Sequence, residues 1–195
     1  MLKEKENLIN KKICKSFIME PTTSEWITVK ESSVHNKGVF AAKDIPKGTK
    51  IIEYVGERIT KQESTIRADK VIDESLKDKT KGAVYLFEIN KRYDIDGNVD
   101  YNTARFINHC CDPNCEVDFE GERIFIFSIK DIKKGEELNY DYGYDTDNYE
   151  DHRCKCGSKN CIGYIVSKED WPKLKRKIGK KKAKEKKKAL KAKSK

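Results

Sequence analysis

Residues 105–115 read RFINHCCDPNC and place one histidine and three cysteines close together. Three more cysteines follow at positions 154, 156 and 161, and only Cys14 stands apart among the seven. A disulfide framework would spread an even number of cysteines along the chain. Because the N-terminus carries charge but lacks the apolar run of a secretory signal, the clusters indicate metal binding first and redox chemistry second.

The second cluster, CKCGSKNC at residues 154–161, brings three thiols within reach of one point, and Gly157 allows the tight turn that this requires. Structural zinc takes four thiolate or imidazole ligands in a tetrahedron, so one ligand must come from elsewhere. The spacing leaves that choice open among Cys110, Cys111, Cys115, His109 and His152. Free thiols in a reducing compartment are the alternative.

Outside these clusters the sequence favours short strands. Alternating or β-branched runs, separated by turn signals, occupy residues 26–32, 50–57, 83–89, 93–97, 115–120 and 123–129. The last run is apolar on both faces, which predicts a central strand. Thr60 and Glu63 have the spacing of a capping box, in which both side chains satisfy backbone N–H groups, and predict a helix from about Lys61 into the 70s. The expected fold class is mostly β, with small sheets and one main helix.

Length and composition set further limits. The 195 residues suit one domain with an appendage and exclude two full catalytic domains. No stretch approaches the roughly 18 uncharged apolar residues that a membrane span requires. We therefore expect a soluble, intracellular protein.

Charge divides the chain in two. Of 42 basic and 33 acidic residues, segment 173–195 holds 14 basic residues and one acid, so it carries +13 while residues 1–172 carry −4. With almost nothing apolar, this tail is expected to be disordered when free, although its Lys and Ala content allows helix once the charge is neutralised. It predicts binding to the phosphates of DNA, RNA or chromatin. Automethylation, solubility or targeting are the alternatives.

Residues 135–152 hold seven acids and no Lys or Arg, together with Tyr140, Tyr142, Tyr144 and Tyr149. Such a surface attracts a cationic partner, and tyrosine rings can contact an ammonium group through their faces. Charge alone equally allows a solvated loop whose tyrosines pack on a sheet.

Taken together, four segments resemble the SET-domain protein lysine methyltransferases. They are HNKGVFA at 35–41, EYVGE at 53–57, RFINHCCDPNC at 105–115 and GEELNYDY at 135–142. The cysteines of 154–161 are similar to the zinc-binding post-SET segment that follows in the family. The resemblance covers roughly Trp26 to Ile165 and implies a SET catalytic domain (26–145) and a post-SET zinc segment (150–166). The polar, irregular residues 1–25 are expected to form a weakly ordered lead-in, and residues 173–195 a disordered Lys-rich tail.

The resemblance implies a β-clip (SET) fold of small twisted sheets, in which the strand carrying Tyr140 and Tyr142 lies beside Asn108 and His109 in a pseudoknot-like crossing. It also implies S-adenosylmethionine as cofactor and a lysine side chain as methyl acceptor. In the family these two approach from opposite faces and meet through a narrow channel.

Roles carry over by position. The resemblance implies cofactor contacts at His35, Asn36, Lys37, Tyr85, Asn108 and His109. It implies Tyr142 as the catalytic tyrosine, with Tyr85 beside the channel and Tyr140 where the family has Phe or Tyr. It also makes Cys111 the fourth zinc ligand, with Cys154, Cys156 and Cys161, so that the post-SET segment closes over the site.

Three positions depart from the family pattern, and none removes a catalytic group. Asn36 replaces a common Gly, and Asn is the non-Gly residue that best accepts a left-handed backbone. Cys110 replaces a Ser, and Ile162 stands where an Arg is frequent. The hydroxyl of Tyr140 leaves less room for a methylated amine than Phe does, so we expect mono- or dimethylation.

The expected function is S-adenosylmethionine-dependent methylation of lysine on a histone or histone-like basic protein, in the nucleus or at chromatin, or in a host nucleus if the source is a microbe. Two alternatives remain. One is methylation of a non-histone protein such as a ribosomal protein, and the other is a non-catalytic chromatin adaptor whose tail carries the function.

Overall fold

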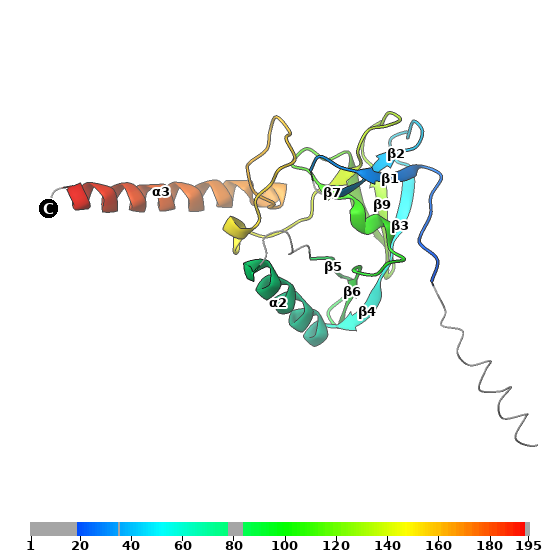
Figure 1. The fold of residues 1–195 in the computed structure, drawn as a ribbon, viewed down its shortest axis with the longest axis horizontal. Coiled ribbons are helices and arrows are strands. Elements are labelled where there is room, and N and C mark those ends of the chain that lie inside the picture. The colour runs from blue at the N-terminus through cyan, green and yellow to red at the C-terminus, as the bar shows by residue number, and fades with distance from the viewer. Residues whose placement is uncertain (1–18, 35, 78–83, 194–195) are drawn as a thin grey trace, which may run out of the picture.

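Small sheets dominate the computed structural model, which describes residues 19–34, 36–77 and 84–193 (Figure 1). One sheet pairs β1 (Ile27–Glu31) with β2 (Lys37–Ala41), and a second has the order β3 (Lys50–Tyr54), β9 (Arg123–Ser128), β8 (Cys115–Glu120). A third has the order β4 (Glu57–Thr60), β6 (Tyr93–Asp96), β5 (Leu86–Glu88), and the fourth pairs β7 (Asn108–His109) with β10 (Asn139–Tyr140). The mostly β class is confirmed.

Helices occupy a smaller part of the described chain. They are α2 (Lys61–Lys77), α3 (Trp171–Lys193) and the short 3-10 turns η1 (Thr103–Phe106), η2 (Tyr149–Asp151) and η3 (Lys168–Asp170). Neither α2 nor α3 is both long and apolar enough to cross a bilayer, as far as the described residues show.

Strand β9 is the centre of the fold, as its apolar sequence predicts. It pairs antiparallel with β3 on one side and with β8 on the other. Ile124 and Ile126 are buried on one face and Phe125 on the other. A strand covered on both faces must be apolar throughout.

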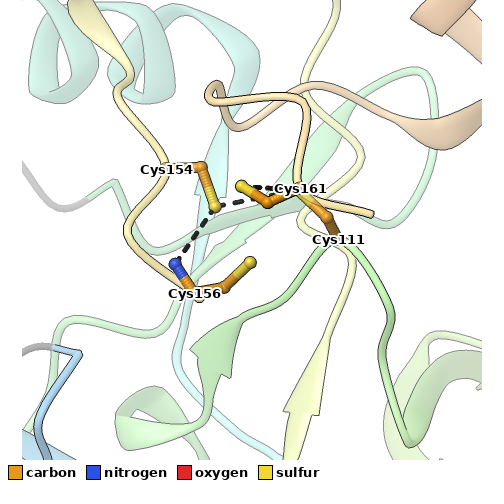
Figure 2. Close-up of side chains that lie close together, drawn as sticks. All are labelled: Cys111, Cys154, Cys156 and Cys161. Carbon is orange, nitrogen blue, oxygen red and sulfur yellow. Dashed lines mark hydrogen bonds between the residues drawn. The ribbon is translucent and has the colours of Figure 1, made fainter. Parts of the chain in front are cut away.

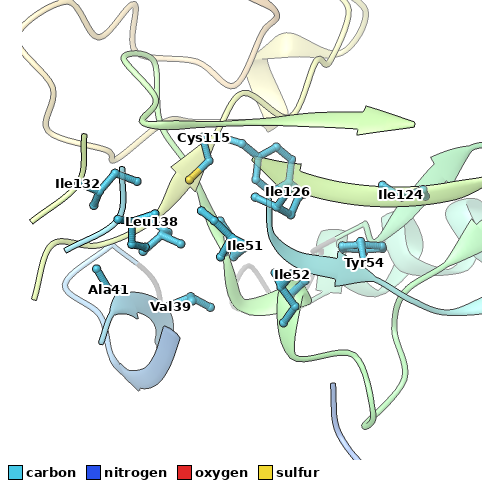
Figure 3. Packing of buried hydrophobic residues seen from close by; sticks show 14 residues of the cluster. Val39, Ala41, Ile51, Ile52, Tyr54, Cys115, Ile124, Ile126, Ile132 and Leu138 are labelled. Carbon is cyan, nitrogen blue, oxygen red and sulfur yellow. The ribbon is translucent and has the colours of Figure 1, made fainter. Parts of the chain in front are cut away.

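The main core joins elements that are distant in sequence. Val39 of β2, Ile51 of β3, Ile126 of β9 and Leu138 ahead of β10 are all almost completely buried and belong to one cluster (Figure 3). Each aliphatic side chain buried in this way contributes roughly 1.5–3 kcal/mol. This cluster fixes β2 and β10 against the central sheet, and these two strands carry predicted site residues.

Helix α2 begins at the predicted residue, but only half of the capping box forms. The Glu63 N–H donates to the Thr60 hydroxyl at 3.2 Å. The Glu63 carboxylate does not return this contact and instead accepts from Arg67 at 2.9 Å. Arg67 also reaches Asp96 of β6 at 2.6 Å, so the glutamate stabilises an arginine that ties α2 to the sheet.

Part of the predicted lead-in, residues 19–25, lies against the body. The Thr22 N–H donates to the Tyr101 carbonyl at 2.9 Å, and the Ser24 hydroxyl donates to the Ile51 carbonyl at 2.6 Å. Residues 1–18 lie outside the described part of the chain.

The Lys-rich segment differs from the expected disorder, because it is helical as far as Lys193. Its start is held by a small apolar cluster in which Leu174 is completely buried beside Tyr149 and Val166. The Trp171 indole N–H also donates to the Val166 carbonyl at 3.1 Å. Figure 1 shows α3 leaving the body as a straight, projecting helix. The charge pattern gave no sign of this docking, which depends on a few apolar residues at the beginning of the segment.

Replacing Leu174 with Ala should therefore undock α3. Loss of a fully buried leucine side chain costs about 2 kcal/mol or more, which corresponds to roughly 30-fold faster amide exchange in the docked turns. Hydrogen exchange read by mass spectrometry would measure it. Leu190→Ala is the matched control in the same helix, because Leu190 is 60% exposed, and it should leave exchange in these turns unchanged. Equal effects of the two substitutions would contradict the docking.

Candidate functional site

The candidate site is built around the parallel pair β7–β10, in which Asn108 lies opposite Asn139 and His109 opposite Tyr140. The Cys110 N–H extends the pairing by donating to the Tyr140 carbonyl at 3.2 Å. Two strands this short have few ladder hydrogen bonds of their own. This is the neighbourhood that the resemblance predicted for the two segments.

Side-chain amides supplement the few backbone hydrogen bonds between β7 and β10. The Asn139 N–H donates to Asn114 Oδ1 at 2.9 Å, and the Asn114 N–H donates to Asn139 Oδ1 at 3.2 Å. Asn114 Nδ2 also donates to the Glu137 carbonyl at 2.9 Å. The loop that leads out of β7 is thus fastened to the beginning of β10.

Asn108 connects this pair to β2. Its Nδ2 donates to the Lys37 carbonyl at 3.1 Å and to Glu137 Oε1 at 2.8 Å. The same Glu137 oxygen accepts from the Ser32 hydroxyl at 2.7 Å. A Cβ at Gly38 would clash with that oxygen, so glycine at this position allows Glu137 to approach. Two predicted cofactor-binding residues from distant segments, Lys37 and Asn108, are therefore in direct contact.

Beside this junction lies a group of aromatic rings. The ring centroids of Tyr140 and Tyr142 are 5.0 Å apart, and those of Tyr142 and Tyr144 are 5.9 Å apart. Phe87 of β5 lies 6.2 Å from Tyr140. Tyr85 lies in the same neighbourhood, because its carbonyl accepts from the hydroxyl of Tyr54 at 3.0 Å and the Tyr54 ring centroid is 4.7 Å from that of Phe87. We call Tyr85, Phe87, Tyr140, Tyr142 and Tyr144 the aromatic cluster.

The hydroxyl of Tyr142 has a fixed direction, because it donates to the Ile107 carbonyl at 3.1 Å. Burial raises the pKa of Tyr142 above its ordinary value and that of Tyr140 well above it. Both hydroxyls are therefore protonated at neutral pH. With its proton committed to Ile107, the Tyr142 oxygen can accept a hydrogen bond from a further group.

His109 lies between the aromatic cluster and the cysteines. Its ring centroid is 5.4 Å from that of Tyr142, and its Nδ1 accepts from the Tyr142 N–H at 3.3 Å. Burial lowers the pKa of His109, against the opposing effect of Asp141 at 3.7 Å. Both the lowered pKa and the accepting Nδ1 favour the neutral ring with its proton on Nε2, which lies 3.6 Å from the sulfur of Cys111.

Four sulfurs converge next to His109. The Sγ atoms of Cys111, Cys154, Cys156 and Cys161 all lie within 4.8 Å of one another (Figure 2). Cys111 Sγ is 3.7 Å from that of Cys154 and 3.8 Å from that of Cys161. Burial raises the pKa of the Cys111 thiol to about 12. Of the candidates that the spacing left open, Cys111 is the one that joins the three later cysteines.

The backbone around the later cysteines forms a closed loop. Arg153 and Tyr164 form an isolated β-bridge, and the Cys154 N–H donates to the Gly163 carbonyl at 3.1 Å. Gly157 has φ +68°, a left-handed conformation that suits glycine, as the tight turn predicted. The Gly163 N–H points at the Cys161 sulfur at 3.3 Å, a contact that favours a thiolate.

The remaining predicted residues are on β2, just before it and in the loop after the cysteines. Asn36 and Lys37 are exposed, and His35 lies outside the described residues. Ile162 packs against the cluster that anchors α3.

Sequence reasoning missed two groups. Glu137 is predicted only as one of seven acids that attract a cationic partner, whereas its carboxylate joins Ser32 and Asn108. The Ile107 carbonyl, which orients Tyr142, leaves no trace in the sequence because any residue supplies a carbonyl. Two open hollows of about 340 Å³ each lie elsewhere, along Trp26 and Phe125 and beside Arg58 and Tyr93, and neither contains a predicted site residue.

The acidic segment 135–152 is partly neutralised by the chain itself. Lys177 of α3 contacts Asp147 at 3.0 Å, and Lys181 contacts Glu150 at 2.6 Å. Tyr149 is buried beneath α3 and takes no part in the aromatic cluster. The charges nearer the tyrosines have no such partner from α3 in the described part of the chain.

Comparison with known proteins identifies this arrangement. Residues 36–143 match the SET domain. The histone-lysine N-methyltransferase, H3 lysine-4 specific, of Candida albicans is 39% identical over 145 residues, covering 71% of this chain and 14% of the relative. The protein of the same description from Saccharomyces cerevisiae is 37% identical over 140 residues, covering 69% of this chain and 12% of the relative.

Histone-lysine N-methyltransferase trithorax of Drosophila melanogaster is 38% identical over 153 residues, covering 75% of this chain and 4% of the relative. The chain therefore spans only 4% to 14% of the length of these three relatives. The SET match alone takes in more than half of the chain and contains β7, β10 and the tyrosines beside them. The chain belongs to the SET-domain family.

Proposed function

We propose that this chain is an S-adenosylmethionine-dependent protein-lysine N-methyltransferase whose substrate is histone H3 or a similar basic protein. One observation carries the proposal: Tyr142 and Tyr140 lie against the Asn108–His109 segment, with the Tyr142 hydroxyl held in one direction. The names of the relatives, which specify histone lysine and in two cases lysine 4 of H3, support the substrate. A nuclear, chromatin-associated location follows from the same substrate.

The residues around β2 and β7 suit a nucleoside cofactor. S-adenosylmethionine supplies an electrophilic methyl group when bound. Lys37 and Asn108 touch each other, His109 adds a neutral imidazole, and the aromatic cluster adds apolar ring surface. This mixture of polar and aromatic groups suits a ligand that combines an amino acid with an adenine ring. Asn36, Lys37, Asn108, His109 and Tyr85 are the described residues that we propose hold it.

The lysine amine must be neutral to act as a nucleophile. A free lysine has a pKa of about 10.4, so it is almost wholly charged at pH 7. Entry into the aromatic cluster removes water and disfavours the ammonium form, which lowers this pKa. The proton is released to solvent before the amine is enclosed, so no dedicated base is required.

Tyr142 then orients the neutral amine. Because its hydroxyl donates to the Ile107 carbonyl, its oxygen can accept one N–H of the amine. That contact turns the nitrogen lone pair away from the tyrosine and toward the reacting methyl group. Such positioning can supply several kcal/mol of rate enhancement, with roughly 7–11 kcal/mol as the limit.

The four-sulfur cluster fits zinc. A Zn–S bond of about 2.3 Å in a tetrahedron places the sulfurs about 3.8 Å apart. The two separations from Cys111 are 3.7 and 3.8 Å. Zinc held here would tie the loop after β7 to residues 154–161 and so close that segment over the site.

Charge favours a basic substrate. Of the seven acids in the acidic segment, Asp147 and Glu150 pair with α3 and Glu137 is bonded to Ser32 and Asn108. Four remain: Glu136, Asp141, Asp145 and Asp151. A lysine-rich peptide would be drawn to them, and added salt would weaken that attraction.

Tyr142→Phe should lower the rate of methyl transfer to histone H3 by roughly 100-fold or more while leaving the fold intact, because it removes one oriented oxygen and keeps the ring. Transfer of labelled methyl groups to the histone would measure the rate. Tyr93→Phe is the control, since Tyr93 lies on β6 under Arg58 at 4.1 Å and outside the aromatic cluster. A Tyr142→Phe enzyme as fast as the control would refute the role of Tyr142.

Tyr140→Phe should shift the product toward trimethyllysine, because loss of a buried hydroxyl beside Tyr142 makes room for a methylated amine. The unaltered enzyme should stop at mono- or dimethyllysine. Mass spectrometry of the product peptide distinguishes these states. An unchanged product distribution, or trimethyllysine as the main product of the unaltered enzyme, would contradict this assignment.

The purified chain should carry one zinc ion, and Cys111→Ser should reduce the zinc content toward zero because a tetrahedral site loses an anionic ligand. Elemental mass spectrometry measures the ratio. Cys110→Ser is the neighbouring control, as its sulfur lies outside the four-sulfur cluster. If the two variants retained the same zinc content, Cys111 would not be the fourth ligand.

A further inference from the structure

Helix α3 has a docked half and a projecting half. In the docked half, Leu174 is buried, Lys177 contacts both Asp147 and the Thr146 carbonyl, and Lys181 contacts Glu150. These contacts fix the direction of the helix relative to the acidic segment. They also pair two of its lysines, Lys177 and Lys181, with carboxylates of the body.

The projecting half has a different character. The basic residues Lys182, Lys184, Lys186, Lys187 and Lys188 are all exposed. Successive helix residues are about 100° apart, so these five lysines point to all sides of the helix. Glu185 is the only acid of segment 173–195, and no carboxylate lies within ion-pairing distance of these five lysines in the described part of the chain.

The position of these five lysines on all sides of the helix favours some anionic partners over others. An amphipathic helix that lies on a membrane has an apolar face, whereas Ala183 is the only uncharged residue between Lys182 and Lys188. A flat acidic surface would contact one stripe of lysines and leave the others unused. A partner with negative charge on both sides of the helix would contact all five lysines.

We propose that the projecting half of α3 binds duplex DNA, with its lysines on the phosphates that flank the major groove. That groove is about 12 Å wide and admits an α-helix, whereas the major groove of duplex RNA is too narrow and deep. Lysines make point contacts with phosphates, and this half has no Arg, Asn or Gln to read base edges. Binding is therefore independent of sequence.

The negative charge of the body determines which part of α3 is available to DNA. Residues 1–172 carry −4, and the acidic segment at the base of α3 repels phosphate. This repulsion favours binding of DNA at the projecting half. At a rise of about 1.5 Å per residue, Lys188 lies roughly 21 Å along the helix from Leu174. The acidic surface near the tyrosines stays open for a basic peptide while DNA is bound.

The test measures DNA binding without any methyl transfer, so its outcome does not depend on the proposed enzymatic function. The variant changes the five projecting lysines together to Gln, which removes charge and retains helix propensity. A matched control changes five exposed lysines of the body, Lys30, Lys47, Lys70, Lys91 and Lys134, to Gln and has the same net charge. Circular dichroism checks that both retain the helical content of the unaltered chain.

Fluorescence anisotropy with a labelled DNA duplex of mixed sequence measures the affinity. Three to five phosphate contacts predict that raising salt from about 50 to 200 mM weakens binding by roughly 40- to 500-fold. The variant with five projecting lysines replaced should lose most of its affinity and of this salt dependence, and the control should keep both. Equal loss in the two variants would overturn the proposal, as would equal or tighter binding to duplex RNA or to anionic lipid vesicles.

Discussion

Two residue pairs between β7 and β10 hold the candidate site together. They place Tyr140 beside His109 and carry Tyr142 to the position where its N–H meets the imidazole. A ladder this short is stabilised from outside, by the reciprocal hydrogen bonds of Asn114 and Asn139 and by Leu138, which is buried in the main core. If this crossing opened, the tyrosines would separate from the residues that we propose hold the cofactor.

Cys111 connects the β7–β10 crossing to the C-terminal part of the chain. Cys111 leaves β7 with its sulfur 3.6 Å from His109 Nε2 and 3.7 Å from the sulfur of Cys154. Beyond the cysteines, Tyr164 and Val166 lead into the cluster around Leu174 that anchors α3. The four-sulfur cluster, the aromatic cluster and α3 are therefore linked through one continuous series of contacts. In our proposals this series places a reactive pocket and a DNA-binding helix at fixed positions in one small protein.

The sequence pattern within single segments predicted the features that depend on neighbouring residues in the chain. The apolar run of β9 predicted a central strand, and Thr60 predicted the start of α2. The short pair β7–β10 has no periodicity to detect, and only resemblance to a family indicated that crossing. Resemblance likewise picked Cys111 over Cys110 and Cys115, which spacing could not distinguish. The docking of α3 was not predicted, because the composition of segment 173–195 is dominated by its charge of +13. The few apolar residues that pack around Leu174 are not noticeable in that composition. The role of Glu137 was not predicted, because its carboxylate accepts from Ser32 and Asn108, which lie in other segments of the chain.

The central claim is that a lysine amine and a methyl donor meet beside Tyr142. The most direct measurement is a crystal structure of the chain with S-adenosylhomocysteine and a peptide of the histone H3 N-terminus. We expect the cofactor product to contact Lys37, Asn108 and His109, and the lysine nitrogen to lie within hydrogen-bonding distance of the Tyr142 hydroxyl. A cofactor bound in the hollow between Trp26 and Phe125, or a lysine side chain outside the aromatic cluster, would contradict the account.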